Sequence, residues 1–185
     1  MYSTSDFKRG LKIEIDGQPY TIVEFENHRP GKGAAVVRTK LKNLLTGQTI
    51  DPTFRSGDKV GRPDLMEKDV DYLYESGGVY NFMDPDNYEQ YEVNEEILGD
   101  ALKFMTENLK VSMLFYQNKP INIDLPNHVV LEVVECDPAV RGDTVQGATK
   151  PAKLQTGYTV NVPLFINEGE KLKIDTRTGD YIERA

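Results

Sequence analysis

Apolar and polar residues alternate in short segments along most of this 185-residue chain, and turn-forming residues separate the segments. Residues 11–15 and 20–25 alternate on either side of Asp16 and Gly17, a pair that favours a two-residue hairpin turn. The pattern recurs at residues 72–83, around a Ser-Gly-Gly turn. Because alternation with a period of two gives a strand one apolar face, the chain is expected to be all-β. Further strands are expected at residues 37–42, 49–54, 88–93, 111–116, 121–125, 129–134, 158–162, 164–166, 171–174 and 181–182.

One segment of the chain has the periodicity of a helix instead. Asn94 is a suitable N-cap, and Glu95 and Glu96 suit the positive end of a helix. The apolar stripe that follows comprises Ile97, Leu98, Ala101, Leu102 and Met105. Three strands precede this helix and two follow it, which is the order of the five-stranded oligonucleotide-binding (OB) barrel.

Prolines mark two joints in the chain, at Pro63 and at Pro126. They divide it into residues 1–63, which are expected to form a small barrel of about five strands, residues 64–127 and residues 128–185. The sequence therefore predicts three small β-barrels in series, with one short helix in the middle domain.

The charge is unevenly distributed among these three parts. The whole chain has 22 Lys and Arg, 30 Asp and Glu, and a net charge of −8, which argues against a nucleic-acid partner. Residues 1–63, however, carry a net charge of +4, whereas residues 64–127 carry −10 and residues 128–185 carry −2. A local surface with its own function is therefore expected in the first part.

The stretch from Asn27 to Ile50 contains no acidic residue and five basic ones. On the strand at residues 37–42, Arg38, Lys40 and Lys42 should share one face. The charge alone leaves two interpretations open, a solvated strand face and a binding surface.

The segment Arg29-Pro30-Gly31-Lys32-Gly33 is the sharpest local motif. Pro30 and Gly31 favour a tight turn, and the flanking glycines leave Lys32 as one long cation on a slim loop tip. No Ser or Thr follows the lysine and a strand comes next, so the motif is not a phosphate-binding P-loop. It is either a generic glycine-rich hairpin with a solvated lysine or a tip that enters a narrow channel.

No group of residues predicts catalysis or metal binding. The only two histidines, His28 and His128, lie far apart in sequence, and Cys136 has no second cysteine to pair with. The Asp84-Pro85-Asp86-Asn87 segment is explained by turn chemistry, because it lacks the length and closing Glu of a calcium loop. We therefore expect a protein that is not an enzyme and has no catalytic residue, cofactor or metal.

The chain also lacks the apolar run that a membrane span needs, and its first residues do not form a signal peptide. A soluble protein of the cytoplasm that does not bind membranes is expected.

These motifs together resemble the family of bacterial translation elongation factor P, over essentially the whole chain. The resemblance is carried by Pro30-Gly31-Lys32-Gly33, by the segment from Val37 to Leu44, and by Thr53-Phe54-Arg55-Ser56-Gly57-Asp58. It continues through Gly142-Asp143-Thr144 and Val162-Pro163-Leu164-Phe165 to the segment from Asp175 to Tyr181.

The resemblance implies an SH3-like (KOW-type) N-terminal domain followed by two OB-fold barrels, in an L-shaped arrangement that mimics tRNA. It also implies binding to the ribosome between the peptidyl-tRNA and exit sites, with contacts to both subunits, and relief of stalling at consecutive prolines. The expected partners are thus the ribosome and peptidyl-tRNA, for a factor that is itself monomeric.

Residue roles follow from the same resemblance. Lys32, carried by Pro30, Gly31 and Gly33, would reach towards the peptidyl-transferase centre, and in many members a modifying enzyme extends the matching lysine. The acid-free basic stretch fits this use, and from it we expect Arg29, Arg38, Lys40 and Lys42 to neutralise phosphates of the peptidyl-tRNA and ribosomal RNA. Gly142, Asp143 and Thr144 match the loop that approaches the exit-site codon, and Tyr181 and Arg184 match C-terminal contacts to tRNA or ribosome.

Two other functions fit the sequence less well. A general oligonucleotide-binding module would carry its basic residues in the second and third parts, where the net charge is negative. A hydrolase or transferase would need a convergent acid–base constellation, which the sequence does not contain.

Overall fold

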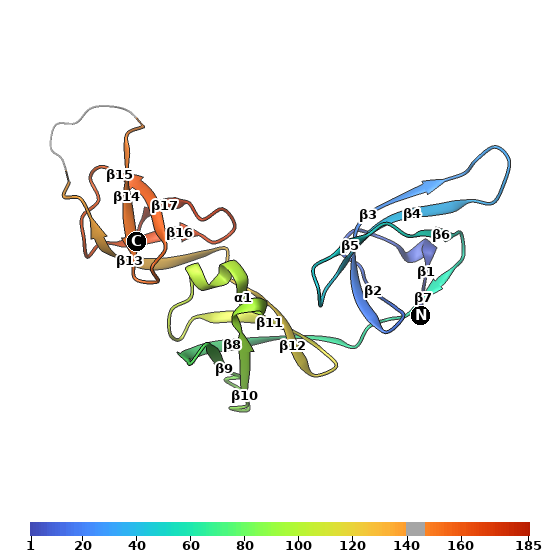
Figure 1. Ribbon diagram of the computed structural model, residues 1–185, viewed down its shortest axis with the longest axis horizontal. Helices are drawn as coiled ribbons and strands as arrows, with labels where there is room; N and C mark the ends of the chain where they lie inside the picture. The colour runs from blue at the N-terminus through green and yellow to red at the C-terminus, as the bar shows by residue number, and fades with distance from the viewer. Residues whose placement is uncertain (140–146) are drawn as a thin grey trace. The chain divides into compact units, whose positions relative to one another are not determined.

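The computed structural model of the protein describes residues 1–139 and 147–185. Its strands have 2 to 12 residues and its helices 3 to 5, so strands dominate the fold (Figure 1). In chain order the elements are β1 (Tyr2–Ser3), the 3₁₀ helix η1 (Thr4–Asp6), β2 (Lys12–Ile15), β3 (Gln18–His28), β4 (Val36–Asn43), β5 (Thr49–Ile50), β6 (Thr53–Arg55), β7 (Lys59–Val60), β8 (Leu65–Ser76), β9 (Val79–Met83), β10 (Gln90–Asn94), α1 (Glu95–Leu98), the 3₁₀ helix η2 (Gly99–Lys103), β11 (Lys110–Tyr116), β12 (Lys119–Asp124), β13 (His128–Cys136), β14 (Thr149–Leu154), β15 (Thr159–Pro163), β16 (Lys171–Asp175) and β17 (Tyr181–Arg184).

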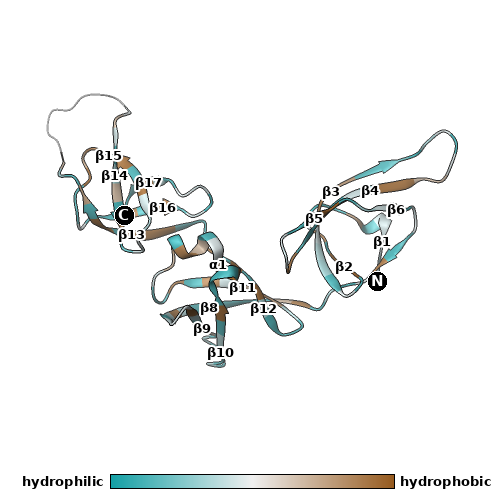
Figure 2. Cartoon of the chain, in the orientation of Figure 1, coloured by the Kyte–Doolittle hydropathy of each residue, from teal (hydrophilic) through white to brown (hydrophobic). Residues whose placement is uncertain are grey.

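The chain divides into two compact units. The first comprises residues 1–66 and 114–122, and the second comprises residues 67–113 and 123–185. In both units hydrophobic residues concentrate on strands such as β4, and the connecting loops are mainly hydrophilic or neutral (Figure 2). The expected all-β fold is confirmed by this element composition.

The first unit is built on a sheet of order β2-β3-β4-β5, with β6 also paired to β4 and with β1 paired to β7. Asp16 and Gly17 adopt φ angles of 51° and 73°, and Ile15 pairs with Gln18, so the expected two-residue hairpin is confirmed. The buried core of this unit comprises Phe7, Ile13, Ile22, Val37, Leu41 and Val60.

The segment expected as one edge strand at residues 49–54 is divided into β5 and β6 by Asp51 and Pro52. The carbonyl of Pro52 accepts hydrogen bonds from the hydroxyl of Thr39 at 2.7 Å and from its backbone N–H at 3.1 Å. A proline cannot donate to a sheet ladder, but its carbonyl here satisfies the buried polar groups of Thr39.

The middle sheet has the order β10-β9-β8-β11-β12. The expected succession of three strands, a helix and two strands is present, and the side chain of Asn94 caps the helix by accepting from the Ile97 N–H at 3.3 Å. The helix is shorter than expected. At Gly99, with a φ angle of 50°, α1 ends and the chain continues as η2, so the α-helical stripe through Met105 is wrong.

The C-terminal sheet has the order β15-β14-β13-β16-β17. Its core includes Leu131, Leu154, Leu172 and Ile174, and also Phe104 from the segment after η2. The Phe104 ring packs edge-on against Tyr158 with centroids 5.4 Å apart.

Two expectations for the C-terminal part are wrong. Residues 164–166 were expected as a strand but lie in a turn that follows Pro163, at the end of β15. Strand β14 was not expected, because Lys150 and Pro151 interrupt its apolar pattern. Burial nevertheless alternates strictly along it, and Lys150, Ala152 and Leu154 are the buried residues.

Candidate functional site

Strands β3 and β4 form the longest hairpin of the first unit, and the loop that joins them projects away from the sheet (Figure 1). Their register runs from Tyr20 opposite Asn43 to His28 opposite Val36, so residues 29–35 form the tip. Strand β6 pairs with β4 as far as Val36, and the core residue Val37 lies beside the tip, so residues 29–35 are the part that projects beyond the sheet.

The two glycines of the tip differ in conformation. Gly33 has a φ angle of +125°, a region that L-amino acids rarely adopt, whereas Gly31 does not lie in that region. Gly31, Lys32 and Gly33 are all exposed, and Pro30 is half-buried. A Cβ atom added to Gly31 would meet nothing within 4 Å. The backbone thus requires glycine at position 33, while glycine at position 31 keeps the tip narrow.

The basic residues of β4 lie where the alternation placed them. Arg38, Lys40 and Lys42 are exposed, and the residues between them are buried on the opposite face. This arrangement presents three cations on one face of the hairpin.

The same face carries acidic residues from β3 that sequence reasoning missed. Glu26 pairs with Arg38 and Glu24 pairs with Lys40, whereas the partner of Lys42 is Thr21. A register shift between Ile22 and Glu24 turns both glutamates to this face. A bulge of this kind has no fixed sequence signature, so the alternation of β4 alone could not reveal the opposing charges.

Lys12 is a further cation at this face. It lies opposite Thr21 in β2, and its ammonium donates to the Thr21 hydroxyl at 3.1 Å. Thr21 therefore has a lysine on each neighbouring strand, Lys12 and Lys42. The register of the first hairpin, which the sequence did predict, could have identified Lys12.

The expected codon-loop residues Gly142, Asp143 and Thr144 lie outside the described residues. The roots of their segment are described. Lys150 is buried, and its ammonium donates to the carbonyl of Asp137 and, at 2.5 Å, to the carbonyl of Ile166. The Ala139 N–H donates to the Asn167 side chain at 3.0 Å. The turn at residues 164–170 thus holds the start and the end of this segment together.

Cys136 lies beside Lys150 and is half-buried, and its thiol donates to the Ile166 carbonyl at 3.7 Å. Burial raises the pKa of the thiol, while the positive charge of Lys150 acts against that rise. A protonated thiol is a weak nucleophile, so the environment of Cys136 does not favour a reactive thiolate.

The two expected C-terminal contact residues already have partners inside the protein. The guanidinium of Arg184 pairs with Glu170 at 3.2 Å and lies 4.8 Å from the centroid of the Phe165 ring. Tyr181 is half-buried and packs against the C-terminal core. Both residues join β17 to neighbouring parts of their own sheet and turn.

Across residues 1–139 and 147–185, no cluster of three His, Cys, Asp or Glu side chains has the geometry to hold a metal ion. None of the helices in the same residues has the length and apolarity that a bilayer crossing requires.

Three family models cover most of the chain. The elongation factor P KOW-like domain matches residues 3–60, the elongation factor P OB domain matches residues 65–123, and the elongation factor P C-terminal domain matches residues 129–184.

Curated proteins of the same name align over the full length. Elongation factor P of Maridesulfovibrio salexigens is 53% identical over 184 residues, which cover 100% of this chain and 99% of that protein. The protein of Bdellovibrio bacteriovorus is 52% identical over 185 residues, which cover 100% of this chain and 98% of that protein.

Among solved structures, eukaryotic translation initiation factor 5A from Methanococcus jannaschii matches with a TM-score of 0.58 and 21% identity. The match covers 67% of this chain and 91% of that one, and it shows a shared fold. With about half of all positions identical over the full length of the curated relatives, the chain belongs to the elongation factor P family of translation factors.

Proposed function

We propose that this protein binds the ribosome between the peptidyl-tRNA and exit sites and relieves stalling at consecutive prolines. Lys32 would position the peptidyl-tRNA from the tip of the β3–β4 hairpin. The observation that carries this proposal is the exposed lysine between two glycines in the loop at the end of the β3–β4 hairpin. The strands on either side of this loop are fixed in the sheet, since β4 pairs with β3 and, as far as Val36, with β6.

The hairpin would act on position rather than on bonds. Holding the end of the peptidyl-tRNA in one orientation removes part of the entropic barrier to attack by the aminoacyl nitrogen. Prolyl substrates react poorly when misaligned, so they benefit most from such positioning. The protein itself would supply neither a nucleophile nor a proton, and its role is not enzymatic.

Phosphate contacts would hold the hairpin in place. The proposed contacts are Arg29, Arg38, Lys40 and Lys42. The register between β3 and β4 indicates which of them contribute most positive potential. Glu26 and Glu24 oppose Arg38 and Lys40 across the hairpin, so these two cations contribute less net positive potential. Lys42, opposite Thr21, and Arg29, at the tip, should contribute more.

The other proposed contacts belong to the same function, which the protein would perform in the cytoplasm. The factor would act as a monomer and contact both ribosomal subunits, with Gly142, Asp143 and Thr144 near the exit-site codon. Tyr181 and Arg184 remain proposed contacts, but Arg184 would have to keep or exchange its interactions with Glu170 and Phe165. An enzyme that extends lysine side chains would act on Lys32, which is exposed.

The test is in vitro translation of a reporter with three consecutive prolines, using protein purified from its native host. Wild-type protein should relieve the stall and Lys32→Ala should not. Lys119→Ala is the matched control, because Lys119 is also an exposed lysine beside a hairpin turn. Equal relief by wild type and Lys32→Ala would refute the role of Lys32. Intact mass of the native protein would show whether Lys32 carries an added group.

A further inference from the structure

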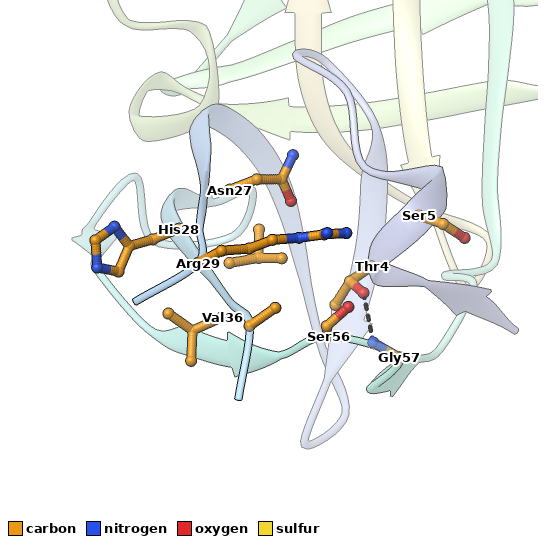
Figure 3. Close-up of a pocket in the computed structure, with 10 residues that line it drawn as sticks. Thr4, Ser5, Asn27, His28, Arg29, Val36, Ser56 and Gly57 are labelled. Carbon is orange, nitrogen blue, oxygen red and sulfur yellow. Dashed lines mark hydrogen bonds between the residues drawn. The ribbon is translucent and has the colours of Figure 1, made fainter. Parts of the chain in front are cut away.

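A pocket of about 410 Å³ lies at the base of the loop that joins β3 and β4, beside η1 and the turn between β6 and β7. Figure 3 shows the side chain of Arg29 extended across it towards Thr4, with Ser56 close by and the ring of His28 pointing away. Three separate segments of the first unit thus meet around one hollow, at the base of the loop that carries Lys32.

The pocket is rich in hydrogen-bond donors that have no partner. Within residues 1–139 and 147–185, the side chains of Asn27, Arg29 and Ser56 make no hydrogen bond or ion pair. The Thr4 hydroxyl accepts from the Gly57 N–H at 2.8 Å, which leaves its own proton free to donate. The pocket therefore offers a guanidinium, two hydroxyls and an amide to an acceptor.

No carboxylate lines the pocket. Three acidic residues adjoin the lining in sequence. Asp6 accepts from the Ser3 N–H at 2.9 Å and Asp58 accepts from the Arg55 N–H at 2.8 Å, while Glu26 lies opposite Arg38 on the sheet. A hollow with one fixed cation, several donors and no acid in its lining favours an oxyanion.

We propose that this pocket binds a backbone phosphate of RNA, next to the point where Lys32 enters its channel. The inference rests on the proposed function and adds a defined contact that anchors the hairpin to RNA. A phosphate held at the base of the loop would fix the position of the hairpin on the RNA and so the depth to which Lys32 reaches.

The size and lining of the pocket favour a sugar-phosphate unit over a base. About 410 Å³ exceeds the volume of a lone phosphate and leaves room for the attached ribose. The apolar part of the lining comes from Ala35, Val36 and Val37. The one aromatic residue of the lining, His28, points its ring away from the hollow (Figure 3), so no ring faces it on which a base could stack. Phosphate contacts position a protein on RNA without reading its sequence, which suits a factor that meets many tRNAs.

The first experiment is an NMR titration of inorganic phosphate into the full-length protein at constant ionic strength. Saturable shift changes are expected at the backbone amides of Arg29, Ser56 and Gly57. They should vanish in Ser56→Asp, which places a carboxylate at the pocket, and in Arg29→Gln. Ser76→Asp makes the same charge change in an exposed strand end elsewhere and should leave the changes intact. Changes located elsewhere, or equal in both Asp variants, would overturn the pocket.

The second experiment identifies the source of the phosphate. Ser56→Asp should lower affinity for ribosomes carrying peptidyl-tRNA by about tenfold, and Ser76→Asp by less than about twofold. Phosphate shifts in the pocket with unchanged ribosome affinity would overturn RNA as the ligand. Because the titration involves neither Lys32 nor the ribosome, a failure of the proposed function in the reporter assay remains distinguishable from a failure of the pocket.

Discussion

Gly31 and Gly33 look equivalent in the sequence, but the hairpin tip uses them differently. Gly33 has a φ angle of +125°, which a side chain opposes through backbone strain of about 1–3 kcal/mol. Gly31 has no such constraint, and a Cβ atom there would project into open space. The motif predicted a slim tip. Only the backbone angles show that Gly33 is needed for the conformation of the tip and that Gly31 serves to keep it narrow.

This difference predicts unequal effects of two alanine substitutions. Gly33→Ala forces the tip out of its conformation and should reduce stall relief strongly in the triproline reporter. Gly31→Ala adds the same methyl group without strain and should reduce it less. Stall relief is measured for both variants, with NMR spectra of the tip amides as the check on conformation. If Gly31→Ala proved the more harmful, width rather than backbone conformation would limit the tip.

Lys150 is a second residue whose role the sequence hides. The sequence predicts no strand around Lys150, but the residue is only 6% exposed and two carbonyls accept hydrogen bonds from its ammonium. A lysine becomes buried where backbone acceptors converge on it, and the convergence of Asp137 and Ile166 is a tertiary feature. Local pattern alone could not have placed it inside.

Replacing this buried ammonium should destabilise the C-terminal sheet. Lys150→Met keeps the length of the side chain and leaves two carbonyls without their donor, so the free energy of unfolding should fall by about 1–3 kcal/mol. Lys153→Met is the control, because Lys153 is exposed on the same strand, and it should change stability by less than about 0.5 kcal/mol. Urea unfolding measures the stability of both variants. Equal losses would contradict a stabilising role for the hydrogen bonds from Lys150 to the two carbonyls.

At the scale of elements, strands with regular alternation were predictable and irregular ones were not. Strands β4 and β13 agree with their expected ranges because buried and exposed residues alternate along all or most of each. Strand β14 was missed because Lys150 occupies a core position. The α-helix was drawn too long because its apolar spacing continues through η2 although the backbone changes at Gly99. Each failure arises where tertiary contacts or backbone angles override the local pattern.

The candidate surface on β3 and β4 shows the same limit. The outward direction of Arg38, Lys40 and Lys42 followed from the period of the strand alone. The opposing Glu24 and Glu26 depend on a register shift, which only the paired structure reveals. The residue types of the site were thus predictable, but the balance of charge across the hairpin was not.

The turn between β11 and β12 is tied to the β2–β3 hairpin within the first unit. The Tyr116 hydroxyl donates to the Glu14 carboxylate at 2.6 Å, and the Gly17 carbonyl also lies within hydrogen-bond distance. The hydrogen bond to Glu14, followed by burial, raises the pKa of Tyr116 to about 12. The neutral phenol is therefore favoured in the folded state.

A pH-dependent contribution to stability follows. Between the ordinary tyrosine pKa of about 10 and the raised value of about 12, the folded protein binds more protons than the unfolded chain. The contribution of Tyr116 is complete below about pH 10 and is lost as the pH rises towards about 12. Tyr116→Phe should lower stability at pH 9 by about 1–2 kcal/mol, and the gap to wild type should narrow at pH 11. Urea unfolding at both pH values measures the gap, and a constant gap would contradict the assigned pKa.

For the whole molecule, the net charge and the proposed phosphate contacts predict opposite effects of salt on ribosome binding. A net charge of −8 repels RNA, and salt weakens this repulsion, so on average charge alone the affinity for ribosomes should rise with salt. The first 63 residues carry +4. Contacts between their cations and phosphates would release counterions, so on local contacts alone the affinity should fall with salt. The sign of the salt dependence therefore shows which of the two governs binding.

We expect the affinity of wild-type protein for ribosomes to fall with salt, because close contacts act within the Debye length, whereas most of the excess negative charge lies in residues 64–127. Each phosphate contact should add about 0.7–0.9 to the steepness of the plot of log affinity against log salt. Lys42→Glu should make the plot shallower, and more so than Arg38→Glu, since Glu26 already opposes Arg38. Binding that strengthens with salt, or a slope unchanged in both variants, would mean that the hairpin cations do not contact phosphates.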